Sequence, residues 1–290
     1  MDGPFPVDLR VCGIGLRFLP PDPVTLGDDL RPFLTHGTAD PDETFQIRLL
    51  EQPLPLPRKP SHTQGSVVIY PADQGWLRVY PGMTAGDGCQ VACLLRPNGE
   101  NILYYPASLW HRFAHPLHCM HLIGAEVWLL RRQAFLLHSS VVIHNGKAVL
   151  FSGPSGSGKS TQADLWQTHL GAQVLNGDRC VARREGEKFL AYGSPWAGTS
   201  GIYRNFSAPI AGVFLVTQAP ENRAERLGFR ALPALLSQTV VNSWDQEFME
   251  EMTTLFQDFL ETIPVFRLYC RPDAQAVTLA RDTLFPEEVM

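Results

Sequence analysis

The segment KAVLFSGPSGSGKSTQADLW, residues 147–166, constrains the fold more than any other part of the sequence. Residues 153–160 fit the pattern G-x-x-x-x-G-K-[ST], an apolar run precedes them, and a helix-forming run follows. In such a loop the glycines let the backbone wrap, so that several N–H groups converge on phosphate oxygens. The segment therefore predicts a strand, a phosphate-binding loop and a helix, which together form the centre of an α/β domain.

Each residue type in this loop has a chemical reason. The helix that starts near Lys159 contributes free N–H groups and the positive end of its dipole. Lys159 supplies a flexible positive charge to the β and γ phosphates, and the hydroxyl of Ser160 is a ligand for Mg²⁺. We therefore expect ATP and Mg²⁺ as cofactors. The residues predicted to bind the nucleotide are Gly153, Pro154, Ser155, Gly156, Ser157, Gly158, Lys159, Ser160 and Thr161.

Composition and charge argue against several classes of protein. The 290 residues carry a net charge of -5 with scattered Lys and Arg, so we expect no nucleic-acid partner and no attraction to anionic membranes. The opening MDGPFPVDLR lacks the basic and apolar regions of a signal peptide. No apolar run approaches the ~18 residues of a membrane helix. We expect a soluble cytoplasmic protein, whose oligomeric state, a homo-oligomer included, stays open.

Residues 1–115 are predicted to form a β-rich region with antiparallel strands. Short β-branched and aromatic segments alternate there with Pro, Gly, Asp and Asn. The Asn98-Gly99 pair favours a tight hairpin turn between two of them. The predicted strands lie in LRVCGIGLRF, FQIRLL, SVVIYP, GWLRVYP, QVACLLRP and NILYYP.

Residues 116–290 are predicted to form a second domain of the α/β class with a mixed sheet. The apolar spacing first indicates a linking helix over about residues 118–135. Two strands and the glycine loop follow, and the rest of the domain alternates between strands and helices. The predicted elements are strands at 136–143, 147–151, 172–178, 180–195 (a hairpin), 209–218 and 265–274, and helices at 159–168, 232–263 (one or two) and 274–284.

Two polar residues are predicted beside the glycine loop. Asp178 ends the strand QVLNGD one short helix after the loop, at a strand end where ligands gather in α/β sheets. His138 lies on the strand before the loop strand, and if these strands pair it faces Asp178 near the γ-phosphate. Each residue also has a purely structural interpretation. Asp178 would then cap the Asn176-Gly177 turn, and His138 would be a satisfied structural histidine.

The stretch HSSVVIHNGKAVLFSGPSGSGKSTQADLW, followed by GAQVLNGDRCVA, resembles the C-terminal kinase domain of HPr kinase/phosphorylase and its relatives. In that family a His opens the strand before the loop, and an acidic pair ends the next strand after a short helix. The arrangement is also similar to the nucleotide core of phosphoenolpyruvate carboxykinase. The resemblance implies phosphoryl transfer to a serine hydroxyl of a peptide or small protein. It further implies that Asp178 activates the acceptor or binds Mg²⁺, and that His138 supports Asp178 or the phosphate.

The sequence departs from this family in two places. The acidic pair is replaced by Gly177-Asp178 or by Asp178-Arg179, depending on the alignment, so one carboxylate is missing. The Glu-Ile-Arg-Gly-type loop associated with the phosphorylase reaction is not found, and phosphorylase activity is therefore not expected. The N-terminal region shows no resemblance to that of HPr kinase.

The segment YGSPWAGTSGIYRN, residues 192–205, has two interpretations. As an acceptor clamp, it would use Trp196 as an aromatic anchor and Arg204 as a catalytic cation that stabilises charge on the transferring phosphoryl group. Arg179 is the other candidate for that cation. As a packed loop, it would bury Trp196 in the core.

The segment HRFAHPLHCMH contains four histidines and a cysteine within eleven residues, at His111, His115, His118, Cys119 and His121. Three of the histidines would share a face of a single helix, which suits a metal ion. Pro116 interrupts such a helix and the cluster contains no carboxylate, so a loop followed by a helix start is favoured over a metal site.

These observations favour an ATP- and Mg²⁺-dependent serine kinase, and two alternatives stay open. One is a kinase that acts on a small metabolite. The other is a nucleotide-binding regulatory module without phosphoryl transfer, which the missing carboxylate allows. The predicted catalytic residues are Asp178, His138, Lys159 and Arg204, and the predicted Mg²⁺ ligands are Ser160 and Asp178.

Overall fold

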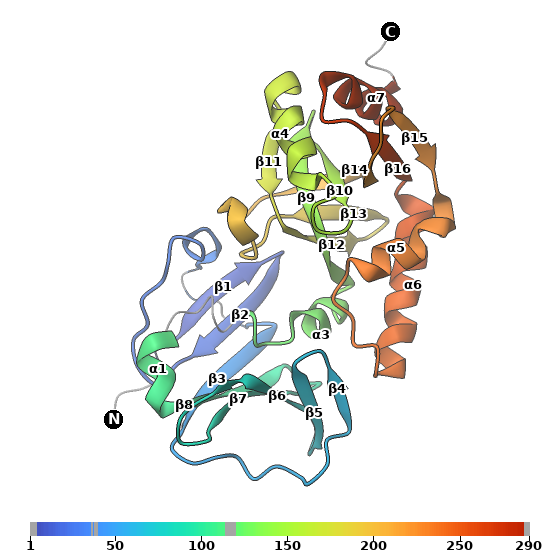
Figure 1. The fold of residues 1–290 in the computed structure, drawn as a ribbon. Coiled ribbons are helices and arrows are strands. Elements are labelled where there is room, and N and C mark those ends of the chain that lie inside the picture. Colours follow the sequence, from blue (N-terminus) through green and yellow to red (C-terminus); the bar gives the residue numbers. More distant parts are fainter. Residues whose placement is uncertain (1–4, 36, 38–39, 114–119, 287–290) are drawn as a thin grey trace. The chain divides into compact units, whose positions relative to one another are not determined.

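The computed structural model describes residues 5–35, 37, 40–113 and 120–286. The chain divides into two compact units (Figure 1), which are called unit 1 and unit 2 below. Unit 1 comprises Met1–Trp128 and Asn242–Gln246, and unit 2 comprises Leu129–Val241 and Glu247–Met290. The division falls after the predicted boundary at residue 115, because the helix α3 (Ala125–Leu130) begins in unit 1.

Unit 1 is built on one eight-stranded sheet, in the order β1-β2-β3-β8-β7-β6-β5-β4. All six predicted strand segments lie in it, and LRVCGIGLRF forms a hairpin of two strands. In the sequence, the 3-10 helix η1 (Arg31–Phe33) lies between β2 and β3, and the helix α1 (Ala107–Phe113) follows β8. The strands are β1 (Val7–Val11), β2 (Ile14–Leu19), β3 (Glu43–Leu50), β4 (His62–Gln64), β5 (Val67–Ala72), β6 (Gly75–Thr84), β7 (Gln90–Leu95) and β8 (Glu100–Pro106).

The sheet of unit 1 is mixed, so the prediction of a purely antiparallel region is wrong. The β2–β3 and β3–β8 pairs are parallel, and the remaining pairs are antiparallel. Parallel neighbours need a long connection between them. Residues 20–42 provide it for the first pair, and the meander of β4 to β7 provides it for the second. Strand composition shows where strands lie but not which distant strand each one joins.

A buried polar cluster explains why residues 242–246 belong to unit 1. Arg78 of β6 and Glu126 of α3 form a buried ion pair, and Arg78 also donates a hydrogen bond of 3.2 Å to Asn242 Oδ1. Two residues further on, the ring of Trp244 stacks on His62 at a centroid distance of 4.9 Å. These contacts hold residues 242–246 to the sheet, although they lie between two helices of unit 2 in the sequence.

The sheet of unit 2 has a parallel part and an antiparallel part, and some strands belong to both. The parallel part is β10-β14-β16, in which β14 pairs with both neighbours. The long strand β9 pairs with both β10 and β12, and the long strand β14 also pairs with β13. Because β12 and β13 form a hairpin, the pairings run from β10 through β9, β12, β13 and β14 and return to β10. The strands are β9 (Ala134–His144), β10 (Lys147–Ser152), β11 (Gln173–Asn176), β12 (Arg179–Glu185), β13 (Lys188–Tyr192), β14 (Ser207–Gln218), β15 (Arg223–Arg226) and β16 (Val265–Cys270).

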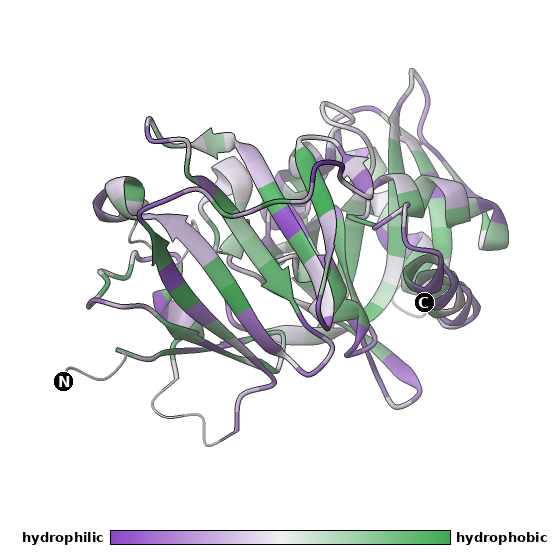
Figure 2. Ribbon diagram, turned by 90° about the horizontal axis from the view of Figure 1, so that it is seen from below, coloured by the Kyte–Doolittle hydropathy of each residue, from purple (hydrophilic) through white to green (hydrophobic). Residues whose placement is uncertain are grey.

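Helices cover both faces of this sheet, which makes unit 2 a three-layer α/β structure (Figure 1). On β10, Leu150 packs into the core beneath α5 and α6, while Phe151 packs into the core beneath α4 and α7. A strand that is buried on both faces requires a continuous apolar run, which is what AVLF supplies. Figure 2 shows hydrophobic residues along the strands of both units. The helices are α4 (Lys159–Leu170), α5 (Leu232–Ser237), α6 (Gln246–Thr262) and α7 (Ala274–Leu284), with 3-10 helices η2 (Gly198–Ser200) and η3 (Gly228–Ala231).

The structure corrects one predicted helix and adds two strands, β4 and β15. The helix expected over residues 118–135 is limited, among the described residues, to α3 at Ala125–Leu130. Gln133 then adopts a left-handed conformation (φ +53°), and β9 begins at the next residue. Strands β4 and β15 were not predicted, because HTQ has only three residues and RAER is short with three charged residues out of four. None of the described helices is both long and apolar enough to cross a membrane.

Candidate functional site

The glycine loop connects β10 to α4, in the order of elements that the sequence predicts. Gly153, Gly156 and Gly158 have φ values of +145°, +78° and +104°, which side-chain-bearing residues rarely adopt. A Cβ at Gly153 would lie 2.9 Å from Ser157 Oγ and 3.2 Å from the carbonyl oxygen of Val216. The loop therefore requires glycine both for its backbone angles and for its close approach to β14.

Lys159 is the first residue of α4 and is almost completely buried. Its Nζ donates hydrogen bonds to the carbonyl oxygens of Gly153 (2.9 Å) and Pro154 (3.0 Å), so the ammonium lies inside the curve of the loop. Burial lowers the pKa of Lys159 from its ordinary 10.5, and the negative charge of Asp178 opposes that shift. The loop thus concentrates positive charge at the point where a polyphosphate would lie.

Asp178 follows β11 and lies beside the loop. Its Oδ1 is 3.4 Å from His138 Nε2, and its Oδ2 is 3.6 Å from Arg179 Nε. The proximity follows from strand register, because His138 of β9 is directly opposite Arg179 of β12. About a third of the side chain of Asp178 is exposed. The structure thus brings His138, Asp178 and Lys159 to one place, with one carboxylate among two cations and an imidazole.

The turn before Asp178 is held by Asn176 rather than by Asp178 itself. The Oδ1 of the buried Asn176 accepts hydrogen bonds from the backbone N–H groups of Asp178 (2.9 Å) and Arg179 (2.8 Å). Its Nδ2 donates to the carbonyl oxygen of Ser194 at 3.2 Å. In return, Ser194 Oγ donates to the carbonyl oxygen of Arg179 at 2.5 Å. The carboxylate of Asp178 is therefore not needed as a turn cap.

Three buried serines stabilise the strands behind these groups. Ser152 Oγ donates to the carbonyl oxygen of His138 (2.8 Å), and Ser140 Oγ donates to that of Gly177 (2.9 Å). The N–H of Ser139 donates to the carbonyl oxygen of Asp178 (2.9 Å). These residues were not predicted as part of the site. The available signal was the hydroxyl pair in HSSVV, which interrupts an otherwise apolar strand.

The protonation of His138 depends on its charged neighbours. Burial is the largest influence and lowers the pKa of His138 below its ordinary 6.5. The positive charges of Lys159 and Arg179 act in the same direction, while Asp178 and a hydrogen bond with Gln238 oppose them. The imidazole is therefore neutral at pH 7, and a neutral imidazole can donate from Nε2 to Asp178 without adding charge to the site.

The loop over residues 192–205 packs onto Asp178. Trp196 is 4% exposed, which agrees with the packed-loop interpretation of this residue. Gly198 has φ +55°, and a Cβ there would lie 2.7 Å from Asp178 Cγ. Similarly, a Cβ at Gly177 would lie 2.4 Å from the Cβ of Ser200. Arg204 is exposed, and the ion pairs of Asp178 go to His138 and Arg179 instead.

The described residues contain no group of three or more His, Cys, Asp or Glu side chains that could hold a metal ion. Of the histidine-rich segment, His115, His118 and Cys119 lie outside the described residues, so the structure describes only part of that cluster. A Mg²⁺ site that consists of Ser160 and Asp178 would not form such a group. Mg²⁺ commonly uses one or two protein oxygens and completes its shell with substrate phosphates and water.

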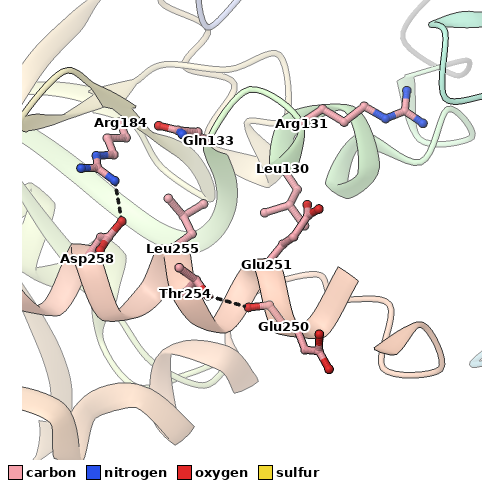
Figure 3. Close-up of a pocket in the computed structure, with 9 residues that line it drawn as sticks. All are labelled: Leu130, Arg131, Gln133, Arg184, Glu250, Glu251, Thr254, Leu255 and Asp258. Carbon is pink, nitrogen blue, oxygen red and sulfur yellow. Dashed lines mark hydrogen bonds and ion pairs between the residues drawn. The ribbon is translucent and has the colours of Figure 1, made fainter. Parts of the chain in front are cut away.

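A separate pocket of about 550 Å³ lies between the segment from the end of α3 to the turn before β9, the end of β12 and α6. Figure 3 shows Arg184 and Asp258 paired at one side of it, with Glu250 and Glu251 further along α6. None of the predicted site residues lines this pocket. It lies toward the end of β12 that is away from Arg179, so it is not continuous with the glycine loop along that strand.

Comparison with known proteins gives little further information. No protein family's sequence profile matches the chain, and no curated protein matches it. Solved structures with a weak similarity to this chain include an Hpr(Ser) kinase/phosphatase from Coxiella burnetii, at 12% identity and a TM-score of 0.31. The similarity covers 53% of this chain and 98% of that one. A score of this size supports no conclusion about shared activity.

Proposed function

We propose that unit 2 is an ATP- and Mg²⁺-dependent kinase that transfers the γ-phosphoryl group to a serine hydroxyl of a peptide or small protein. The observation that carries the proposal is the position of Asp178, next to His138 and close enough to Lys159 to affect its pKa. A glycine loop alone indicates only a bound phosphate. A carboxylate at the same place adds a group that can accept a proton from an acceptor hydroxyl.

In the proposed reaction, Asp178 accepts the proton of the serine hydroxyl while the serine oxygen forms a bond to the γ-phosphorus. The bond from that phosphorus to the β,γ-bridging oxygen breaks, and ADP leaves with the electron pair. Lys159 and the loop N–H groups hold the phosphates, and neutral His138 positions the carboxylate. Mg²⁺ would be held by Ser160 and Asp178, whose oxygens suit a hard cation, and it would neutralise phosphate charge. Arg204 is proposed as a further cation, with Arg179 as the nearer candidate.

The proposal is tested with radiolabelled ATP, Mg²⁺ and a pool of serine-containing peptides, with an alanine-substituted pool as the blank. We expect label on the serine pool only. Asp178→Asn should lower kcat at least about 100-fold, because general base catalysis contributes 10²–10⁴-fold, while ATP affinity measured without Mg²⁺ changes little. The matched control is Asp164→Asn, an exposed carboxylate on α4, which should leave both quantities unchanged.

A second function is favoured by one specific observation. The ion pairs of His138 and Arg179 converge on the single carboxylate of Asp178, where the family that the sequence resembles has an acidic pair. One carboxylate is sufficient for nucleotide binding but must serve both as base and as metal ligand in transfer. If the protein binds ATP but forms neither phosphopeptide nor ADP nor autophosphorylated protein, the kinase proposal is overturned in favour of a nucleotide-binding regulatory module.

A further inference from the structure

A second pocket lies on the other side of the glycine loop. It has a volume of about 480 Å³ and is lined by the loop, the first turn of α4 and the ends of β14 and β16. The parallel strands β10, β14 and β16 direct their carboxyl ends to this edge of the sheet. Ligands of open α/β sheets bind outside the carboxyl ends of such strands. His138 and Asp178 do not line this pocket, so it is separate from the group that contains them.

Two residues that line this pocket each have a buried polar atom without a hydrogen-bond partner among the described residues. Gln162 is 2% exposed, and its Nε2 donates to Cys270 Sγ at 3.3 Å, while its Oε1 has no partner. The Oγ of Ser157, in the loop itself, also has none. An unsatisfied buried acceptor destabilises the protein, because it has lost its hydrogen bonds to water. A ligand that donates a hydrogen bond here would recover part of the lost free energy, so the pocket favours a donor-bearing ligand.

The remaining walls suit a flat, partly apolar group. Val216, Ala219 and Pro272 contribute apolar surface. Arg271 lies at the rim, where Asp273 accepts a hydrogen bond from its Nε (2.8 Å) and Gln275 accepts one from its NH2 (3.0 Å). These two bonds restrict the guanidinium, and a restricted planar cation is a surface on which an aromatic ring can stack.

We propose that this pocket holds the nucleoside of the bound nucleotide, and that Gln162 Oε1 accepts a hydrogen bond from the exocyclic amino group of adenine. The inference rests on the proposed function, because it takes the loop to hold the phosphates. It also sets the direction in which the phosphates lie along the loop. The γ-phosphate end points toward Asp178, and the α-phosphate end passes Thr161 toward Gln162. The nucleoside and the acceptor serine thus approach the loop from opposite sides.

The experiment compares three ligands in the presence of Mg²⁺ by calorimetry: ATP, inosine triphosphate and inorganic tripolyphosphate. Inosine triphosphate carries an oxygen where adenine has the amino group. We expect the full-length protein to bind ATP about tenfold more tightly than either of the others, which is the scale of one buried hydrogen bond. Gln162→Met should weaken ATP binding about tenfold and leave tripolyphosphate binding unchanged. Gln167→Met, the same change at an exposed position of α4, should alter neither.

The outcomes separate this inference from the proposed function. Equal binding of ATP and inosine triphosphate by the unaltered protein overturns the inference without depending on any variant. An equal loss of all three ligands in Gln162→Met also overturns it, because the residue would then support only the loop. If the unaltered protein binds none of the three ligands, the loop holds no phosphate, and both the inference and the proposed function fail.

Discussion

The two sides of the glycine loop differ in how their polar groups are satisfied. On the side of β9 and β12, His138, Asp178 and Arg179 contact one another. On the side of β14 and β16, the polar atoms Gln162 Oε1 and Ser157 Oγ have no hydrogen-bond partner within the part of the chain that the structure describes. One loop therefore separates a group of charged residues in mutual contact from a pocket lined by residues with unpartnered polar atoms.

We infer from this difference that one side of the loop serves turnover and the other serves ligand preference. Charged groups that already contact one another need little reorganisation at the moment of reaction, which suits phosphoryl transfer. Unpartnered polar atoms in a partly apolar pocket discriminate between ligands, because a ligand that lacks the matching donor leaves them unsatisfied. If the division is correct, substitutions on one side should change turnover and substitutions on the other should change ligand preference. The loop lysine should affect both.

The largest effect is expected for Lys159→Met, because Lys159 is expected to contribute both to turnover and to ligand binding. The substitution removes the ammonium inside the loop, so binding of ATP and of tripolyphosphate should weaken at least about 100-fold, as expected for loss of a buried charge-assisted contact. Calorimetry measures both ligands, and circular dichroism checks that the fold is kept. Lys188→Met, at an exposed position of the β12–β13 hairpin, is the control and should bind normally. Retained tripolyphosphate binding in Lys159→Met would contradict the assigned role of the loop.

Gly198→Ala should impair only the side of the loop that contains Asp178, and so lower turnover rather than ATP affinity. Its Cβ would lie 2.7 Å from Asp178 Cγ, so the carboxylate must move, and we expect kcat to fall about 10- to 100-fold with ATP affinity nearly unchanged. Gly201→Ala is a matched control, because Gly201 has a similar φ (+62°) but no atom of the described residues lies within 4 Å of the added Cβ. Both variants carry the same backbone strain. If both lose activity equally, strain in the loop is the cause rather than displacement of Asp178.

The pH dependence of turnover should report on His138. Its pKa is lowered below 6.5, so the imidazole is neutral at pH 7 and becomes protonated as the pH falls through that lowered value. Protonation would pull Asp178 away from the acceptor serine, so kcat should fall on the acidic side, with a midpoint below 6.5. His138→Gln should lose this acidic limb and lower kcat about tenfold. An unchanged pH profile in His138→Gln would show that another group titrates.

The same shift affects stability, with a definite sign. Unfolded chains bind a proton at His138 near pH 6.5, whereas the folded protein binds it only at lower pH. The free energy of unfolding should therefore decrease as the pH falls from 6.5 through the lowered pKa. Urea unfolding at several pH values should show a smaller decrease for His138→Gln than for the unaltered protein.

The smallest effect is expected far from both sides of the loop. Asp258→Asn in α6 removes the ion pair with Arg184 in the pocket of Figure 3, where both side chains are about a third exposed. Pairs at this exposure contribute about 0–1 kcal/mol, so the thermal midpoint should change little. Turnover and ATP affinity should stay the same. A large loss of activity in this variant would show that the distant pocket acts on the site.

The sequence by itself determined the local features of this protein. The glycine pattern, the apolar run of β10 and the helix after the loop follow from backbone sterics and periodicity, which act over a few residues. Seven of the eight strands of unit 1 and the helix at Ala274–Leu284 were predicted for the same reason, and only β4 of that sheet was not. The parallel pairs of unit 1 were missed, because strand direction depends on how distant segments join.

Only the tertiary structure decided what surrounds the loop. The approach of His138 to Asp178 depends on the register of β9 and β12, and the release of Asp178 from its turn depends on the side chain of Asn176. The Gln162 pocket forms where the glycine loop and the start of α4 meet the ends of β14 and β16, so no single segment contains its pattern. Register and packing are set by the free energy of the whole fold. The sequence therefore predicts a phosphate at this loop, while the folded chain decides which groups face it.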